Sequence, residues 1–278
     1  MGKIVLTGAA GRLGSYLREP LLKISGGNLV SMDIKDDIGE LLPGETYVRA
    51  DLANYDEVAA LMDGVETVVH FGAIVDDGPF MELLGPNFVG SYNVWESAFQ
   101  AGAKRIVYAS SVHAIGMYPI HQTIDTEVPK RPDSFYGLAK CFTEDLGRLF
   151  YEKRGLESVH LRIYSCTSVN SRRSLWAWLS YDDLVHLVER AVLTPTVGFA
   201  VVYGVSNNDR TSLDNSKARF LGYKPKDNAE TYAEEMEAKE PPHDPNDLAA
   251  TRIGGPFASG ELGVSAMVNL KTDADGKS

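Results

Sequence analysis

The sequence predicts an α/β fold in which a doubly wound parallel sheet carries a small C-terminal lobe. Through the first two-thirds of the 278 residues, short β-rich runs alternate with stretches whose apolar residues recur at helical spacing. A glycine-rich turn follows the first β-rich run directly. Strand–helix alternation produces right-handed βαβ units, which place parallel strands in one sheet and helices on both of its faces.

Each element of this alternation has its own signal. Runs rich in Val, Ile, Tyr and Thr predict strands at 3–8, 28–33, 46–51, 66–72, 104–110 and 157–163. Amphipathic stretches between the runs predict helices at 13–23, 55–62, 87–101 and 135–154. These elements account for the sheet and for both helical layers.

After residue 163 the pattern changes to a stretch rich in Ser, Arg and Trp. The expected features are an irregular segment at 164–181, a helix at 182–193, a strand at 200–204, a helix near 215–221 and a break at 239–247. We therefore predict a core at 1–163, a substrate lobe at 164–263 interleaved with the last strands, and a flexible tail at 264–278.

Composition limits the classes of partner. The net charge is 27 − 38 = −11 and the pI is near 5.0, which argues against binding nucleic acid or anionic membranes. Cys141 and Cys166 form no CxxC pair, so we expect buried free thiols and no metal site. The N-terminus enters a strand at once, without a basic and apolar leader, and the longest apolar stretches are strand-sized. We expect a cytoplasmic protein.

The turn after the first strand reads TGAAGRLG and predicts a dinucleotide site. Gly8, Gly11 and Gly14 permit a tight turn and let backbone N–H groups approach a pyrophosphate at the N-terminus of the next helix. Arg12 and Leu13 lie inside this turn and are assigned to the same site. The spacing is GxxGxxG, and its position between a strand and a helix makes the signal specific.

The second strand ends at Asp33, about 20 residues further on, where an acidic residue binds the adenosine ribose hydroxyls. Its carboxylate repels a 2′-phosphate, so NAD is favoured over NADP, although Lys35 lies close by. Further cofactor contacts are expected at the ends of the third and fourth strands, at Asp51, Leu52, Gly72 and Ala73.

The fifth strand ends in two serines and a histidine, and the next helix carries Tyr136 and Lys140 four residues apart. Tyrosine has a pKa of about 10 and is a poor base at neutral pH. A nearby ammonium lowers that pKa, so the phenolate can take a proton from a substrate hydroxyl. A serine hydroxyl would hold the substrate oxygen in place.

The glycine turn, the serine-ended strand and YxxxK together resemble the short-chain dehydrogenase/reductase superfamily in its extended branch, over residues 3–225. The resemblance implies a Rossmann-like fold and a catalytic triad of Ser111, Tyr136 and Lys140, the last two of which also contact NAD. It implies a structural or proton-relay role for Asn87. By the same resemblance we expect a homo-oligomer that associates through the helices at 87–101 and 135–154.

The stretches ASSVHAIGMYP, RPDSFYGLAKCFTEDL, LRIYSC and WLSYDDLV are similar to uronate dehydrogenases. This resemblance implies oxidation of a hexuronate, glucuronate or galacturonate, at C1 to its lactone with NAD. It implies substrate contacts at Ser111, His113, Ser165 and Arg173. Arg173 would pair with the sugar carboxylate, because a guanidinium fork matches that group. Arg172 is assigned to the same site as the second member of an arginine doublet.

Several positions depart from the family pattern. Val112 and Val75 replace an asparagine and a serine, Tyr164 replaces a glycine, and Ser212-Leu213 replaces a pair of tryptophans. Loss of two polar contacts changes the selectivity of a sugar site, because a hydroxyl that loses its partner is costly to bury. The arginine doublet would suit a larger anion, so a C6-sulfonated or C6-phosphorylated glucose is a close alternative substrate.

Two other classes compete with the dehydrogenase hypothesis. Nucleotide-sugar epimerases and dehydratases of the extended branch have the same triad, but they have a longer C-terminal domain than the roughly 80 residues here. A non-enzymatic protein that senses redox state by binding NAD could use the same fold. Such a sensor would not need Ser111, Tyr136 and Lys140 together.

Overall fold

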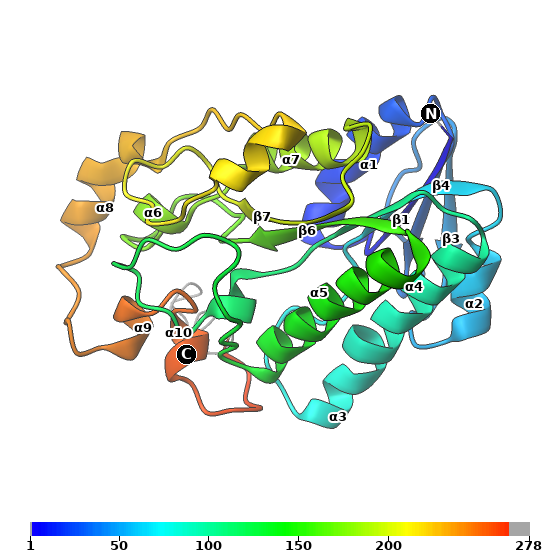
Figure 1. Cartoon of the computed structure of the whole chain (residues 1–278). Helices are drawn as coiled ribbons and strands as arrows, with labels where there is room; N and C mark the ends of the chain where they lie inside the picture. Colours follow the sequence, from blue (N-terminus) through cyan, green and yellow to red (C-terminus); the bar gives the residue numbers. More distant parts are fainter. Residues whose placement is uncertain (1, 267–278) are drawn as a thin grey trace.

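A computed structural model describes residues 2–266 and shows one seven-stranded parallel sheet (Figure 1). The strands are β1 (Lys3–Thr7), β2 (Leu29–Asp33), β3 (Glu45–Arg49), β4 (Val65–His70), β5 (Arg105–Tyr108), β6 (Glu157–Ile163) and β7 (Phe199–Gly204). Their order is β3-β2-β1-β4-β5-β6-β7. The direction of winding reverses between β1 and β4, and ligands of such sheets bind beyond the carboxyl ends of the strands at this point.

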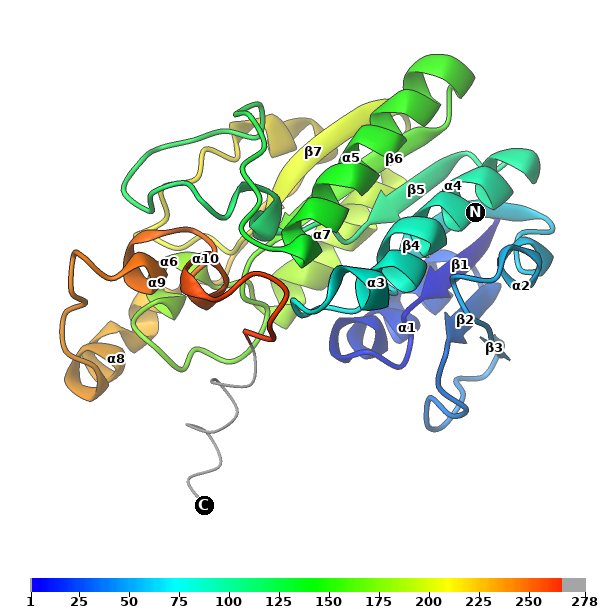
Figure 2. The same cartoon turned by 90° about the horizontal axis from the view of Figure 1, so that it is seen from below.

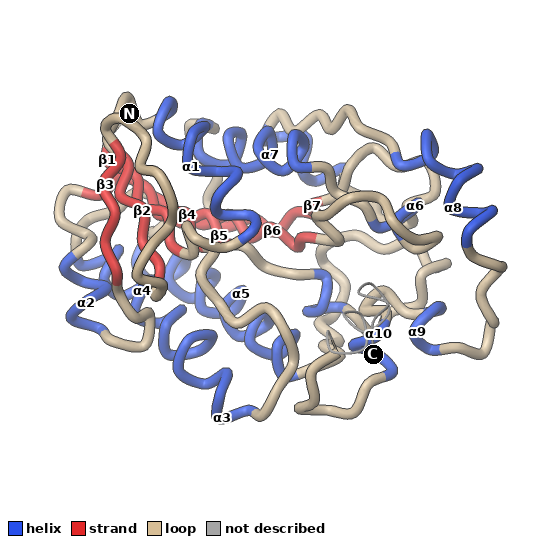
Figure 3. Tube along the Cα trace, turned by 180° about the vertical axis from the view of Figure 1, so that it is seen from behind, coloured by secondary structure: helices blue, strands red, loops and turns tan. Residues whose placement is uncertain are grey.

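Helices cover both faces of the sheet (Figures 2 and 3). One face carries α1 (Arg12–Ile24) and α7 (Tyr181–Leu193). The other carries α2 (Tyr55–Ala60), α4 (Gly90–Gln100) and α5 (Phe135–Arg154). The helix α3 (Phe80–Leu83) continues into α4 through a π-helical turn at Leu84–Val89.

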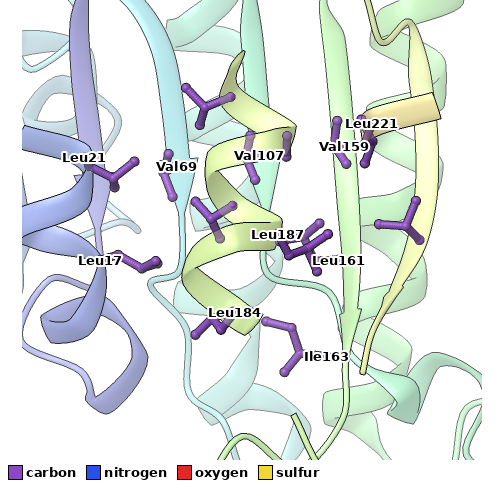
Figure 4. Packing of buried hydrophobic residues seen from close by; sticks show 14 of the residues in the cluster. Leu17, Leu21, Val69, Val107, Val159, Leu161, Ile163, Leu184, Leu187 and Leu221 are labelled. Atoms are coloured by element: carbon purple, nitrogen blue, oxygen red, sulfur yellow. The ribbon is translucent and has the colours of Figure 1, made fainter. Parts of the chain in front are cut away.

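Successive side chains of each strand point to opposite faces of the sheet, so the hydrophobic core has one part on each face. Val69 and Val107 pack under α1 and α7, whereas the preceding residues Val68 and Ile106 pack under α2, α4 and α5. Figure 4 shows the first of these clusters, with leucines of both helices above the valines of the sheet. Burial of the central strands on both faces explains why β1, β4 and β5 read as largely apolar runs.

The C-terminal part of the chain lies at one end of the sheet (Figure 1). It contains the helices α6 (Ser174–Ala177), α8 (Ala233–Lys239), α9 (Leu248–Thr251) and α10 (Pro256–Ser259). Residues 251–254 return to the loop after β5, where the Ile253 amide donates to Tyr118 and the Gly254 amide to Gly116. No helix within residues 2–266 is long and apolar enough to cross a membrane.

The α/β fold and all seven strands are confirmed, with ends that shift by up to two residues. Two helix predictions were wrong in detail. The helix expected at 87–101 is continuous in structure from residue 80, and the helix expected near 215–221 is a 3-10 turn at Ser216–Leu221. Residues 267–278 of the predicted tail lie outside the described residues, and the division at residue 163 stays a prediction.

Candidate active site

The glycine turn forms a close approach between β1, α1 and the end of β4. Gly8 has a φ of +74°, and a Cβ built on it would lie 2.6 Å from the Gly72 nitrogen. A Cβ on Gly14 would lie 2.0 Å from the Gly8 carbonyl oxygen. Only glycine is accommodated at these positions. The result is a tight turn with little side-chain bulk at the N-terminus of a 13-residue helix, which fits a dinucleotide pyrophosphate.

Asp33 ends β2 beside this turn, as expected. Its Oδ2 accepts a hydrogen bond of 2.9 Å from the Ala10 amide, which places the carboxylate at the glycine turn. Lys35 lies on the same side, with Nζ 3.4 Å from the Ala10 carbonyl oxygen. Arg12 is exposed at the first residue of α1, and Leu13 follows it half-buried.

The residues expected after β3 and β4 lie next to one another. Leu52 is buried, and its Cδ1 would be 2.8 Å from a Cβ on Gly72. The Gly72 amide donates to Thr7 Oγ1 at 3.1 Å, so the end of β4 is joined to the end of β1. Asp51 Oδ1 accepts from the Ala53 amide at 2.9 Å and shapes the turn before α2. Together with half-buried Ala73, these residues form one edge of the candidate cofactor site.

The two serines after β5 have different surroundings. Ser110 donates to Glu144 Oε1 at 2.7 Å, and Glu144 in turn forms a buried ion pair with Arg162. Ser111 lies beyond this network and caps the 3-10 turn at Val112–Ile115, where it accepts from the His113 amide at 3.2 Å. Ser110 therefore has a structural role, and Ser111 is the serine next to Tyr136.

Helix α5 brings Tyr136 and Lys140 to the same place because Ser134 caps the helix and fixes where it begins. The Lys140 Nζ lies 5.1 Å from the centre of the Tyr136 ring and donates to the Ala109 carbonyl at 2.8 Å. Burial lowers the pKa of Lys140 to about 7, and Glu144 opposes this shift. Burial raises the pKa of Tyr136, whereas the neighbouring Ser111 hydroxyl lowers it.

His113 faces the same tyrosine. Its ring centre is 5.6 Å from that of Tyr136 and 4.0 Å from that of Phe257, which comes from α10. Its Nδ1 lies 2.8 Å from Oδ2 of Asp133. The histidine is therefore part of a cluster to which three separate segments of the chain contribute.

The arginine doublet is divided by the structure. The Arg172 side chain donates to the Glu240 carbonyl at 2.9 Å and lies 4.0 Å from the Glu237 carboxylate, towards α8. Arg173 turns the other way, stacks on Trp176 at 4.5 Å and donates to the carbonyls of residues 252 and 253. Ser165 follows β6 and is half-buried beside α6. Only Arg173 of the doublet lies next to the segment that carries Phe257.

Val75, Val112 and Tyr164, which depart from the family pattern, lie in two kinds of surroundings. Val75 is exposed in the loop after β4. Val112 and Tyr164 are buried in one apolar cluster, and the Tyr164 hydroxyl has no hydrogen-bond partner within residues 2–266. Asn87 holds the loop that carries Val75, through hydrogen bonds of 2.8 and 2.9 Å with the backbone of Ile74.

Residues 4–191 match the model of the NAD dependent epimerase/dehydratase family. The chain belongs to this family. Its match to the family model covers the strands β1 to β6, both glycines of the close approach and the Tyr136–Lys140 helix.

Similar proteins cover nearly the whole chain. The uronate dehydrogenase of Pseudomonas putida is 42% identical over 92% of this chain and 97% of its own length. The structure of uronate dehydrogenase from Agrobacterium tumefaciens superposes with a TM-score of 0.89 at 41% identity, covering 94% of this chain and 98% of that one. An NAD-dependent glucose-6-phosphate dehydrogenase of Haloferax volcanii is 32% identical over 84% of this chain and 97% of its own length.

Sequence reasoning missed three residues of the site. Asp133 precedes a helix and looks like a capping residue, and Phe257 lies beyond a stretch without regular structure. Asp77 is buried after β4 and accepts from the Tyr136 amide at 3.2 Å and from the Gly263 amide at 2.9 Å. Nothing in the local sequence predicts these long-range contacts.

Proposed function

We propose that this protein oxidises a hexuronate, glucuronate or galacturonate, at C1 to the lactone with NAD. The observation that carries the proposal is the meeting of Tyr136, Lys140 and Ser111 with His113 at the carboxyl end of the sheet. An aldose in its ring form has one hydroxyl whose oxidation gives a lactone, and that hydroxyl is on C1. The relatives that are 41–42% identical and named uronate dehydrogenases support the same substrate class.

Ser111, Tyr136 and Lys140 each have a separate role in the proposed reaction. Ser111 holds the C1 oxygen by a hydrogen bond, and Tyr136 accepts the proton from that hydroxyl. Lys140 lies close enough to stabilise the phenolate, because its ammonium is only 5.1 Å from the ring centre. NAD, when bound, accepts the hydride from C1. Gly8, Gly14 and the remaining predicted cofactor residues would hold it.

Arg173 would bind the C6 carboxylate, and His113 would hold a ring hydroxyl. The guanidinium lies against Trp176, which restricts its motion, and its two terminal nitrogens also donate to the carbonyls of residues 252 and 253, so the carboxylate would be bound by the remaining N–H groups. Arg172 would contribute only positive charge, because its side chain is engaged by Glu240 and Glu237.

The test is NADH formation from a panel of sugars, measured by absorbance. We expect turnover of glucuronate and galacturonate, and little of glucose, which lacks the anion that Arg173 binds. Turnover of glucose 6-phosphate or a 6-sulfonated glucose in place of the uronates would assign the site to the alternative anions. Arg173→Met should raise the KM for a uronate by at least about 30-fold, because a hydrogen bond to a charged group contributes about 2 kcal/mol or more.

We also propose that the protein is a cytoplasmic homo-oligomer that associates through α4 and α5, which lie side by side on one face (Figure 2). Large apolar side chains of this face are at least 38% exposed, namely Met81, Val89, Tyr92, Leu138, Phe142 and Leu149. A patch of this kind is typical of an interface. Sedimentation of the wild type and of Phe142→Glu tests it, with a monomeric wild type as the contradicting result.

A further inference from the structure

Asp133 is a fully buried carboxylate at the edge of the candidate site, and it has few partners. The exposed fraction of its side chain is 0%. Its Oδ1 accepts a hydrogen bond of 2.8 Å from the Ser134 hydroxyl, and its Oδ2 lies 2.8 Å from Nδ1 of His113. A carboxylate buried this completely is stable only when hydrogen-bond donors surround it.

The chain makes room for this carboxylate with glycines from separate segments. A Cβ on Gly116 or on Gly254 would lie 1.7 Å from Asp133 Oδ2, and a Cβ on Gly137 would lie 3.1 Å from Oδ1. The Gly254 amide also donates to the Gly116 carbonyl at 2.9 Å, which holds these two glycines together beside the carboxylate. The carboxylate is therefore fixed in place, and so is the imidazole that it contacts.

The contact determines which ring nitrogen of His113 carries a proton. An ionised carboxylate accepts hydrogen bonds and cannot donate them, so a 2.8 Å contact requires a proton on Nδ1. In the neutral ring, Nε2 then has a free lone pair on the opposite edge. No hydrogen bond joins Nε2 to another residue within 2–266, and Phe257 covers one face of the ring at 4.0 Å between ring centres.

We propose that Asp133 is the positioning residue of the sugar site: it keeps the proton of His113 on Nδ1, so that Nε2 accepts a hydrogen bond from a sugar hydroxyl. This rests on the proposed function insofar as His113 contacts the substrate. Without Asp133 the imidazole favours the other tautomer, with the proton on Nε2, and becomes a donor at the atom that should accept. The substrate then loses one hydrogen bond at a position away from the reacting C1.

The spectroscopic test compares the wild type with Asp133→Ala and Asp133→Asn by nitrogen-15 NMR of the histidine rings, with His113→Ala to assign the signals. The wild type should show a protonated Nδ1 and an unprotonated Nε2 at His113. Asp133→Ala should move the proton to Nε2. Asp133→Asn retains an acceptor oxygen of the same size, so the proton of His113 should stay on Nδ1 as in the wild type. This variant also provides a measurement if the alanine variant fails to fold.

The kinetic test uses the same variants with a uronate and NAD. Loss of a binding contact that is equal in the ground and transition states raises KM and leaves kcat unchanged. We expect KM to rise about tenfold in Asp133→Ala, with the asparagine variant between the alanine variant and the wild type. Asp183→Asn is the matched control, because Asp183 is also buried but accepts from Ser206 Oγ at 2.6 Å and from the Lys226 amide at 2.8 Å, neither of which is assigned to the site.

The outcomes separate the two proposals. A wild-type His113 with its proton on Nε2, or an Asp133→Ala variant with an unchanged KM, overturns the role of Asp133 while leaving the dehydrogenase activity intact. A fall in kcat with an unchanged KM would also contradict it. A wild type that is inactive with every uronate, but whose tautomer still depends on Asp133, would instead refute the proposed function.

Discussion

The buried ion pair between Glu144 and Arg162 supports the end of β5, and its disruption should be costly. The side chains are 1% and 2% exposed, and two hydrogen bonds of 2.9 Å join them. Burial acts to raise the pKa of Glu144, but the bonds from Arg162 outweigh it and keep the pKa below its ordinary value. Glu144→Gln removes the negative charge and leaves the guanidinium buried.

The loss of unfolding free energy in Glu144→Gln depends on which partners Arg162 keeps. Apart from Glu144, its guanidinium donates to the Thr126 carbonyl at 3.2 Å, and this contact does not neutralise the charge. Removal of one partner from a buried ion pair costs about 3–5 kcal/mol, a large part of the roughly 5–15 kcal/mol that stabilises a folded protein. Replacement of both residues, as in Glu144→Leu with Arg162→Met, should recover most of this loss.

Urea unfolding, followed by tryptophan fluorescence, measures the free energy of unfolding of these variants. Asp145→Asn is the neighbouring control, because the Asp145 side chain is 74% exposed and its ion pair with Lys130 lies at the surface. Surface pairs contribute about 0–1 kcal/mol. A loss in Glu144→Gln below about 1 kcal/mol, or equal to that of the control, would refute the reasoning.

Three further predictions concern Tyr136, Asp33 and the buried histidines. Tyr136→Phe should lower kcat by about 10²–10⁴-fold with little change in KM, measured by NADH formation; an unchanged kcat would exclude Tyr136 as the base. Asp33→Ala should raise the KM for NAD by about 10–150-fold and improve use of NADP, since charge-assisted bonds contribute about 1.5–3 kcal/mol. Burial lowers the pKa of His70 and His160 in the folded protein to about 3, whereas the pKa in the unfolded chain is about 6.5. The unfolded chain therefore binds protons first as the pH falls, and the folded state loses stability between about pH 6.5 and pH 3. Acid unfolding of His160→Gln should show a shallower slope than the wild type, by up to about 1.4 kcal/mol per pH unit; equal slopes would contradict this.

The sequence is sufficient for the centre of the sheet because strands such as β1, β4 and β5 are buried on both faces and therefore read as apolar runs. The glycine turn could be predicted as well, since both glycines have a reason within the turn: Gly8 has a φ of +74°, and a Cβ on Gly14 would lie 2.0 Å from the Gly8 carbonyl oxygen. Helix ends are also local: Ser134 caps α5, and Gly155, with a φ of +73°, ends it. The 3-10 turn at 216–221 differs from the helix expected there because its sequence has helical spacing but only six residues.

Side-chain partners were predictable only where they are close in sequence. The pair Tyr136 and Lys140 follows from helical spacing, but the contact of His113 with Asp133 crosses 20 residues of loop and turn. Phe257 reaches His113 from a segment more than 140 positions away, after a stretch without regular structure. Arg172 and Arg173 could not be distinguished from the sequence. In the structure their side chains point in different directions, with Arg172 bound to the Glu240 carbonyl and Arg173 stacked on Trp176.

Thiol reactivity is a point on which the sequence sufficed. Cys141 and Cys166 are buried and free. Burial raises the pKa of each thiol to about 12, so neither forms a thiolate at neutral pH. We expect no loss of activity with a thiol-alkylating reagent under native conditions.

Hydride transfer from C1 is the central claim, and glucuronate deuterated at C1 tests it most directly. The purified protein is incubated with this sugar and NAD, and the reduced cofactor and sugar product are analysed by mass spectrometry. The account predicts one deuterium in each reduced cofactor and a lactone that has lost it. Deuterium retained in an isomerised sugar without net reduction of NAD would contradict the account and indicate an epimerase.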